Sequence, residues 1–167
     1  LRTIPTITIN QDAQRAIQQA DMIVLGPGDL YTNTIANLVV SGVAKVIESS
    51  SAKLVFVMNL MSRPGETYNY KASDYLNDLS KYLKADRLDY VIINSETSPS
   101  PKVLKKYAAE GAIPVKDDLG NHWGKVQIIR ARLRSSHRIK IDKADAVIRS
   151  MVRHDPLILA KVITKLL

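Results

Sequence analysis

The chain has 167 residues, of which 46% are apolar and 24% charged, with no cysteine and a net charge of +8. This composition is typical of one soluble globular domain, or of one lobe of a larger domain, and it excludes a disordered chain, a disulfide scaffold and thiolate chemistry. The longest uncharged stretch, residues 30–44, is too short to cross a bilayer and no signal peptide is visible, so the sequence predicts a cytoplasmic protein without a membrane span.

Short apolar runs alternate with helical periodicity through the first two thirds of the chain. The apolar runs predict strands at residues 22–25, 54–58, 90–93 and 113–115. The periodic segments predict helices after Asn10, over residues 34–49, over residues 71–84, and from Pro101 onward. Strands that are apolar throughout and are joined by helices predict an α/β fold, in which a mostly parallel sheet has helices on both faces.

The pattern changes at residue 117, and this change divides a single domain into β/α units at residues 1–116 and a basic C-terminal segment at residues 117–167. The second part contains a predicted strand at residues 126–129. It ends with two predicted helices, one capped by Asp142 and running to about residue 153, and the last capped by Asp155.

Positive charge is concentrated toward the C-terminus, since residues 1–100 carry 9 Lys/Arg and 10 Asp/Glu, whereas residues 101–167 carry 15 and 6. Such a segment, with residues 130–140 at its centre, could attract nucleic acid, an acidic partner protein or a polyphosphate ligand, or could be a solvated surface. The signature of a groove reader is missing, since the sequence shows neither a Cys/His finger nor an aromatic-rich strand. The chain has one Phe and one Trp, so the composition argues against nucleic acid as a partner.

Residues 26–33, Gly-Pro-Gly-Asp-Leu-Tyr-Thr-Asn, lie between a predicted strand and a predicted helix. Loops at the carboxyl ends of parallel strands bind ligands, and two glycines let the backbone approach a ligand closely. The helix, capped by Thr32 or Asn33, would offer unpaired amides to a phosphate or diphosphate. Asp29 could instead hold a metal ion or a sugar hydroxyl. The alternative is a tight turn that joins strand to helix and binds nothing.

Residues 59–67 form a second loop, which is long for a connection between strand and helix and rich in polar groups. Arg63 could bind a phosphate through two hydrogen bonds, or it could pair with Glu66 across the Pro-Gly turn. Asn59 could bind a base or a sugar, or it could cap the loop backbone. Because polar loops at this edge of a sheet are often functional, we expect this loop to close over the ligand.

A third loop and the histidines carry weaker signals. Residues 94–98 are polar and could complete a nucleotide cleft or form a solvated turn. His122 lies in a turn and His137 in the basic segment, while His154 precedes Asp155, where a His-Asp pair is usually a helix cap. No two histidines have metal-ligand spacing, so the sequence predicts no histidine metal site.

Three motifs occur in an order that resembles a known family. The first is Gly26-Pro27-Gly28-Asp29-Leu30-Tyr31-Thr32, followed by Asn37-Leu38-Val39-Val40 and Gly42. The second is Asn59-Leu60-Met61-Ser62-Arg63-Pro64-Gly65-Glu66-Thr67, followed by Ala72-Ser73-Asp74. The third is Val152-Arg153-His154-Asp155-Pro156 with Leu159-Ala160. Together they resemble the signatures of YvcK/CofD-like proteins, which include the bacterial gluconeogenesis factors and the related 2-phospho-L-lactate transferases.

The resemblance implies a Rossmann-like fold with a nucleotide in a cleft at the sheet edge. It implies a regulatory protein that binds UDP-sugars and serves carbon-source adaptation and cell morphogenesis, and it favours a non-catalytic binding protein over an enzyme. The alternative that it implies is a phosphotransferase of the 2-phospho-L-lactate type, with a guanosine nucleotide and with Mg²⁺ assisted by Asp29 or Glu66. Family members begin with a glycine-rich loop that has no counterpart in this chain, so the resemblance predicts the C-terminal half of a longer protein.

The two loops and the resemblance together define a set of expected ligand contacts, with no catalytic residue assigned. The expected contacts are Gly26, Pro27, Gly28, Asp29, Leu30, Tyr31, Thr32, Asn33, Asn59, Met61, Arg63, Gly65, Glu66 and Thr67. Binding would order the loops and alter a surface that a protein partner or a second copy of the chain could recognise.

Overall fold

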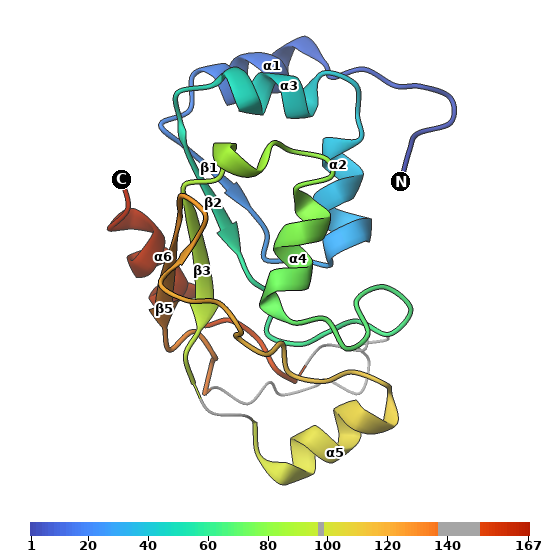
Figure 1. Ribbon diagram of the computed structural model, residues 1–167, viewed down its shortest axis with the longest axis vertical. Coiled ribbons are helices and arrows are strands. Elements are labelled where there is room, and N and C mark those ends of the chain that lie inside the picture. Colours follow the sequence, from blue (N-terminus) through green and yellow to red (C-terminus); the bar gives the residue numbers. More distant parts are fainter. Residues whose placement is uncertain (97–98, 137–150) are drawn as a thin grey trace, which may run out of the picture.

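The computed structural model describes residues 1–96, 99–136 and 151–167. Within these residues the strands of the sheet follow the order β1 (Met22–Leu25), β2 (Lys53–Val57), β3 (Tyr90–Asn94), β5 (Val126–Ala131) and β4 (His122–Trp123). The first four strands in this order are parallel to their neighbours, and β4 is antiparallel to β5. This arrangement confirms the predicted α/β fold with a mostly parallel, Rossmann-like sheet (Figure 1).

The helices of the described residues are short. In chain order they are α1 (Gln11–Gln18), the π-helix η1 (Leu30–Ile35), α2 (Ala36–Leu38), α3 (Val43–Ser49), α4 (Ala72–Leu79), the 3₁₀-helix η2 (Ala85–Arg87), α5 (Pro101–Ala109) and α6 (Pro156–Thr164). The helix predicted after Asn10 is confirmed, and so is the predicted cap at Asp155, whose side chain accepts backbone amides of the first turn of α6. Asn10 caps α1 in the same way, through the amide of Ala13. None of these helices combines the length and the apolar character that a bilayer span requires.

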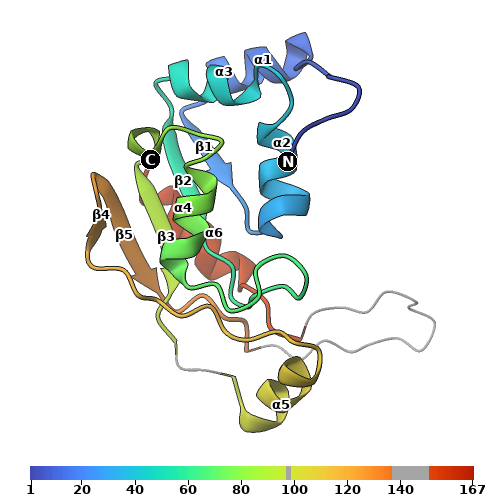
Figure 2. The same ribbon diagram turned by 45° about the vertical axis from the view of Figure 1, so that its right-hand side comes forward.

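Helices cover both faces of the sheet because the central strands are apolar on both faces. On β2, Leu54 and Phe56 are buried on one face, and Val55 and Val57 are buried on the other, as the alternation of side chains along a strand requires. The first face packs against α2 and α4, and the second packs against α6 (Figures 1 and 2).

The predicted continuous helix over residues 34–49 is wrong. The helix begins earlier, at Leu30, and ends at Leu38, after which the chain turns and α3 begins. The turn lies at Gly42, whose φ of +94° is in the left-handed region that favours glycine. A Cβ added to Gly42 would lie 2.9 Å from Cγ2 of Ile9, so the close approach of the N-terminal segment also requires glycine there.

Replacing Gly42 with alanine is expected to lower the free energy of unfolding by about 2–3 kcal/mol, because left-handed strain adds to a steric overlap with Ile9. Gly124→Ala is the matched control, since Gly124 also has a positive φ but no atom lies within 4 Å of an added Cβ. The control should lose only about 1 kcal/mol from backbone strain. Urea denaturation of both variants measures the difference, and equal losses would show that the Ile9 contact contributes nothing.

Residues 113–115 do not form the predicted fourth strand of the sheet. Pro114 makes one isolated bridge with Met61, and Lys116 makes another with Lys71. Proline has no amide hydrogen with which to continue a ladder of hydrogen bonds, which explains why this apolar run stays outside the sheet. The fourth parallel strand is β5, which the sequence predicted only as a further strand of unassigned position.

Other predicted elements change in extent or position. The helix predicted over residues 71–84 ends at Leu79, where α4 ends. The first strand, predicted as buried, is at one edge of the sheet, and Val24 is 39% exposed. The helix predicted from Asp142 falls on residues outside the described ranges, apart from its last three residues, and so does His137.

Candidate ligand-binding site

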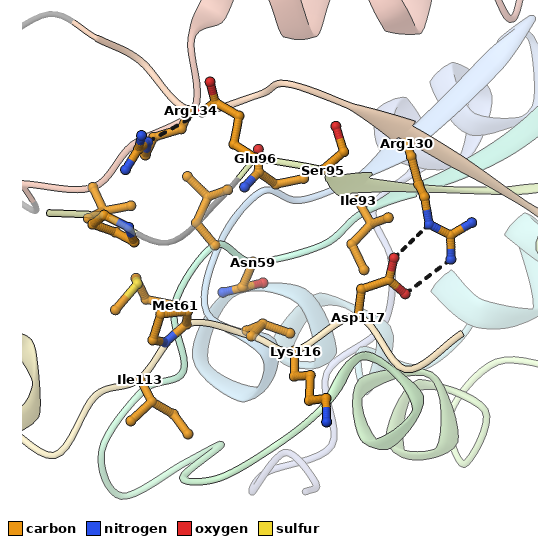
Figure 3. A pocket seen from close by; sticks show the side chains of 16 residues that line it. Asn59, Met61, Ile93, Ser95, Glu96, Ile113, Lys116, Asp117, Arg130 and Arg134 are labelled. Carbon is orange, nitrogen blue, oxygen red and sulfur yellow. Dashed lines mark hydrogen bonds and ion pairs between the residues drawn. The ribbon is translucent and has the colours of Figure 1, made fainter. Parts of the chain in front are cut away.

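Two cavities lie at the carboxyl end of the sheet, where the loops after β1, β2 and β3 meet. The larger, the loop cavity, has a volume of about 850 Å³ and is lined by residues 27–29, residues 59–64, part of α5 and residues 151–154. The smaller, the strand-end cavity, has a volume of about 590 Å³ and extends past the end of β3 (Figure 3). Both volumes fall in the range of small-molecule sites.

The structure brings the two predicted loops to one cavity. The expected ligand contacts that line the loop cavity are Pro27, Gly28, Asp29, Asn59, Met61 and Arg63. The other expected contacts shape or support the two loops, and they are Gly26, Leu30, Tyr31, Thr32, Asn33, Gly65, Glu66 and Thr67. The sequence thus located the loops, whereas the division into lining and supporting residues depends on the fold.

Two glycines of the first loop occupy positions where an added side chain would be crowded. Gly26 has a φ of +80°, and a Cβ there would lie 3.1 Å from the carbonyl oxygen of Val57. A Cβ at Gly28 would lie 3.2 Å from Cβ of Asn33. The side chain of Leu30 is buried in the core, so only its backbone could contact a ligand.

The helix after the first loop is not capped as predicted. It begins at Leu30, so Thr32 and Asn33 lie within η1 and neither is its N-cap. The N-cap is Asp29, whose carbonyl oxygen accepts the amides of Asn33 and Thr34 at 3.1 Å. The Asp29 carboxylate makes no capping hydrogen bond, which leaves it able to interact with the second loop.

An ion pair and a hydrogen bond join the two loops. Nη1 of Arg63 lies 3.0 Å from Oδ2 of Asp29, and the Thr32 hydroxyl donates to Oε1 of Glu66 at 3.2 Å. The predicted salt bridge between Arg63 and Glu66 is present but longer, at 3.9 Å. Because the Arg63 side chain is 58% exposed, a ligand in the loop cavity can reach its guanidinium.

Thr67 stabilises the shape of the second loop. It is buried, and its hydroxyl accepts hydrogen bonds from the Arg63 amide and the Tyr75 hydroxyl, both at 2.9 Å. Burial raises the pKa of Tyr75 to about 12, so its phenol remains a donor at neutral pH. Gly65, with a φ of +79°, lies in the turn between Arg63 and Thr67.

A buried carboxylate that the sequence analysis did not single out anchors the first loop. Oδ2 of Asp78 accepts the hydroxyls of Tyr31 and of Tyr70, the latter at 2.7 Å, and Oδ1 accepts the Lys81 ammonium. Burial alone would raise the pKa of Asp78, but these three hydrogen bonds outweigh burial and hold the pKa below its ordinary value. An acidic residue on the inward face of the helix predicted over residues 71–84 is the sequence signal that could have identified it.

His154 lies on the wall of the loop cavity, where the sequence predicted part of a helix cap. Its ring makes a hydrogen bond with the Met58 backbone, and its Nε2 is buried without a hydrogen-bond partner among the residues that the structure describes. Burial lowers the pKa of His154 below 6.5, so the ring is neutral at pH 7 and carries one nitrogen that accepts hydrogen bonds.

Sequence reasoning missed the wall that α5 contributes. Lys106, Tyr107 and Glu110 line the loop cavity on this side. The Tyr107 hydroxyl accepts the Val152 amide at 3.0 Å, which ties α5 to the segment that carries His154. No residue of α5 is buried, and the helix projects from the body of the molecule (Figure 1).

The third predicted loop lines the strand-end cavity, where its polar groups pair with the chain itself. Oδ1 of Asn94 accepts the Leu133 amide at 3.0 Å, and Glu96 pairs with Arg134 at 3.3 Å (Figure 3). Residues 97–98 lie outside the described ranges. Because these pairs occupy the strand-end cavity, the loop cavity is the stronger candidate for a ligand.

The charges of the loop cavity suit an anion. Its wall carries the cations Arg63, Lys106 and Arg153 and the carboxylates Asp29 and Glu110, which leaves an excess of one positive charge. Over residues 1–96, 99–136 and 151–167, no three His, Asp or Glu side chains gather in a group that could hold a metal ion.

The parallel sheet and the cavity at its carboxyl edge define an α/β protein with the ligand-site geometry of nucleotide-binding folds. A family model described as 2-phospho-L-lactate transferase CofD matches residues 2–134, and the chain belongs to this CofD family. The resemblance predicted from the three motifs is thereby confirmed.

Relatives of this chain include proteins of known name and of known structure. A Thermotoga maritima protein is 39% identical over 152 residues, which cover 90% of this chain and 45% of that protein. The gluconeogenesis factor of Bacillus subtilis is 37% identical over 103 residues, which cover 62% of this chain and 32% of that protein. A crystal structure of a Bacillus halodurans protein matches with a TM-score of 0.81 at 30% identity, over 94% of this chain and 47% of that chain. The chain spans less than half the length of each.

Proposed function

We propose that this chain contributes a UDP-sugar binding site to a regulatory protein of the gluconeogenesis-factor type. The observation that carries the proposal is the loop cavity, in which the Asp29–Arg63 ion pair joins two loops around a space of about 850 Å³. The similarity to the Bacillus subtilis gluconeogenesis factor supports the same class of protein.

The diphosphate would lie against the first loop. Gly28 lets the backbone come close to a ligand there, and the cationic side chains of the cavity outnumber its carboxylates. Ligand binding would favour one arrangement of the two loops and so alter a surface that a protein partner recognises. Through this partner the protein would serve carbon-source adaptation and cell morphogenesis in the cytoplasm.

A second candidate function is phosphoryl transfer, which the description of the matching family model favours. In that case a guanosine nucleotide would be the substrate, and Asp29 or Glu66 would assist Mg²⁺. The described residues do not by themselves gather a set of metal ligands, so other parts of the protein would have to complete that site. The regulatory proposal requires no such addition.

Thermal unfolding of the full-length protein that contains these residues separates the two candidates. A UDP-sugar at a concentration one hundred times its dissociation constant should stabilise the protein by about 2.7 kcal/mol. GDP with Mg²⁺ should give no comparable shift. A clear preference for GDP, together with formation of a phosphorylated product, would contradict the proposal and assign the transferase function.

Replacing Arg63 with alanine is expected to weaken UDP-sugar binding by about 1.5–3 kcal/mol, because it removes a charged donor and leaves the Asp29 carboxylate unpaired beside the anion. Asp29→Asn should have no such cost, because it frees Arg63 and removes a negative charge. Arg15→Ala is the matched control, since Arg15 pairs with Asp12 on α1, which lies at the opposite end of the sheet (Figure 1). Calorimetric titration measures all three, and equal losses in Arg63→Ala and Asp29→Asn would mean that the pair only holds the loops together.

A further inference from the structure

Two residues that line the loop cavity each carry a buried hydrogen-bond acceptor without a partner among the described residues. Oδ1 of Asn59 and Nε2 of His154 are both buried, and neither has a hydrogen-bond partner within the described parts of the chain. Both residues line the loop cavity. A buried acceptor without a donor destabilises the unbound protein, so a ligand that supplies donors would recover this free energy on binding.

The two acceptors belong to one corner of the cavity. The His154 ring makes a hydrogen bond with the backbone of Met58, which directly follows β2, and Asn59 is the next residue in the chain. The Met58 amide is already bonded to the Ile92 carbonyl, so the Met58 carbonyl is the group that the ring contacts. This bond engages one ring nitrogen as a donor and leaves Nε2 as the acceptor, which fixes the tautomer of His154.

The polarity of this corner selects a class of ligand group. Asn59 Oδ1 and a neutral imidazole nitrogen accept hydrogen bonds, whereas the oxygens of phosphate are themselves acceptors and carry negative charge. A hydroxyl group can donate to either acceptor without bringing a charge into a buried position. The cations Arg63 and Lys106 offer charge to an anion in the same cavity.

On the basis of the proposed function, we infer that Asn59 and His154 bind the hydroxyl groups of the sugar and set the direction of the nucleotide-sugar in the loop cavity. The sugar lies against Met58 and Asn59, just beyond the end of β2, and the diphosphate lies toward the cationic side chains. His154 is therefore a specificity-determining residue that distinguishes a nucleotide-sugar from the bare nucleoside diphosphate.

The test compares UDP with UDP-glucose by calorimetric titration of the full-length protein and its variants. The unmodified protein should bind UDP-glucose about thirtyfold more tightly than UDP, since two hydrogen bonds that contribute roughly 1 kcal/mol each correspond to about this factor. His154→Phe and Asn59→Leu should each reduce this preference about three- to tenfold, while leaving the affinity for UDP unchanged within about twofold. His154→Gln, which retains a donor and an acceptor, should restore part of the preference.

His122→Phe is the matched control, because His122 is an exposed residue of β4 outside both cavities. Thermal unfolding of each variant establishes whether it folds. If the His154→Phe protein does not fold, Asn59→Leu serves as the test. Equal affinity of the unmodified protein for UDP and UDP-glucose would overturn the inference alone, as would equal losses for both ligands in the variants. Absence of binding by either ligand would overturn the proposed function and the inference with it.

Discussion

Replacing Asp78 with alanine is expected to lower the free energy of unfolding by about 3 kcal/mol, because it leaves the hydroxyls of Tyr31 and Tyr70 without their acceptor. Asp78 is 5% exposed, so water cannot readily replace the lost carboxylate. The same variant should weaken ligand binding, since Tyr31 belongs to the first loop and Asp78 anchors it to α4. Urea denaturation and calorimetric titration measure the two effects.

The control for this prediction removes the donors together with the acceptor. In a protein that already carries Tyr31→Phe and Tyr70→Phe, Asp78→Ala should cost much less, because no hydroxyl is then left without its acceptor. Asp86→Ala, at an exposed position of η2, should change the free energy of unfolding by less than about 0.5 kcal/mol. A loss that is equally large with and without the two hydroxyls would contradict the assigned role of Asp78.

The stability of the protein should also depend on the ionisation of Asp78. The pKa of Asp78 in the folded protein lies below the ordinary value of 3.8, so its ionised form stabilises the fold at and above that pH. This contribution is lost as the pH falls from about 4 through the lower pKa of the folded state. Denaturation measured between pH 2 and pH 7 should therefore show a smaller acid loss for Asp78→Asn than for the unmodified protein. An identical acid profile would show that Asp78 is not stabilised by its three donors.

Replacing Gly28 with valine is expected to abolish UDP-sugar binding, with a loss of affinity of about one hundredfold or more. The Cβ would lie 3.2 Å from Cβ of Asn33, so the branched side chain must displace η1 or project into the loop cavity. Either result closes the approach of a diphosphate to the backbone. Calorimetric titration with UDP-glucose measures the effect.

Gly28→Ala should give an intermediate loss, because it adds the tight contact with Asn33 but no branched atoms. Gly120→Val is the matched control, since a Cβ there would meet only the His122 carbonyl oxygen at an ordinary 3.8 Å. Unchanged affinity in a folded Gly28→Val protein would remove the first loop from the binding site.

Much of the fold could be predicted from the sequence because local patterns determine it. Apolar runs identified β1, β2 and β3, and the loops after them were expected at one edge of the sheet, where they lie. The pattern failed where a single residue overrides it. Gly42 interrupts an otherwise continuous helical stripe because its backbone is left-handed, and Pro114 keeps an apolar run out of the sheet because it lacks an amide hydrogen.

The candidate site could be predicted as two loops but not as a set of contacts. The pairing of Arg63 with Asp29, rather than chiefly with the nearby Glu66, depends on where the two loops meet in space. The position of His154 on the cavity wall also depends on contacts between segments that are distant in the sequence. Sequence spacing contains no information on such contacts.

In the proposed function, the loops at residues 26–33 and 59–67 enclose one nucleotide-sugar site. A crystal structure of the full-length protein with UDP-glucose tests this claim most directly. We predict that the diphosphate lies within hydrogen-bond distance of the backbone of residues 27–30 or the Arg63 guanidinium, between the two loops. A ligand bound elsewhere on the protein, with the space between these loops empty, would contradict it.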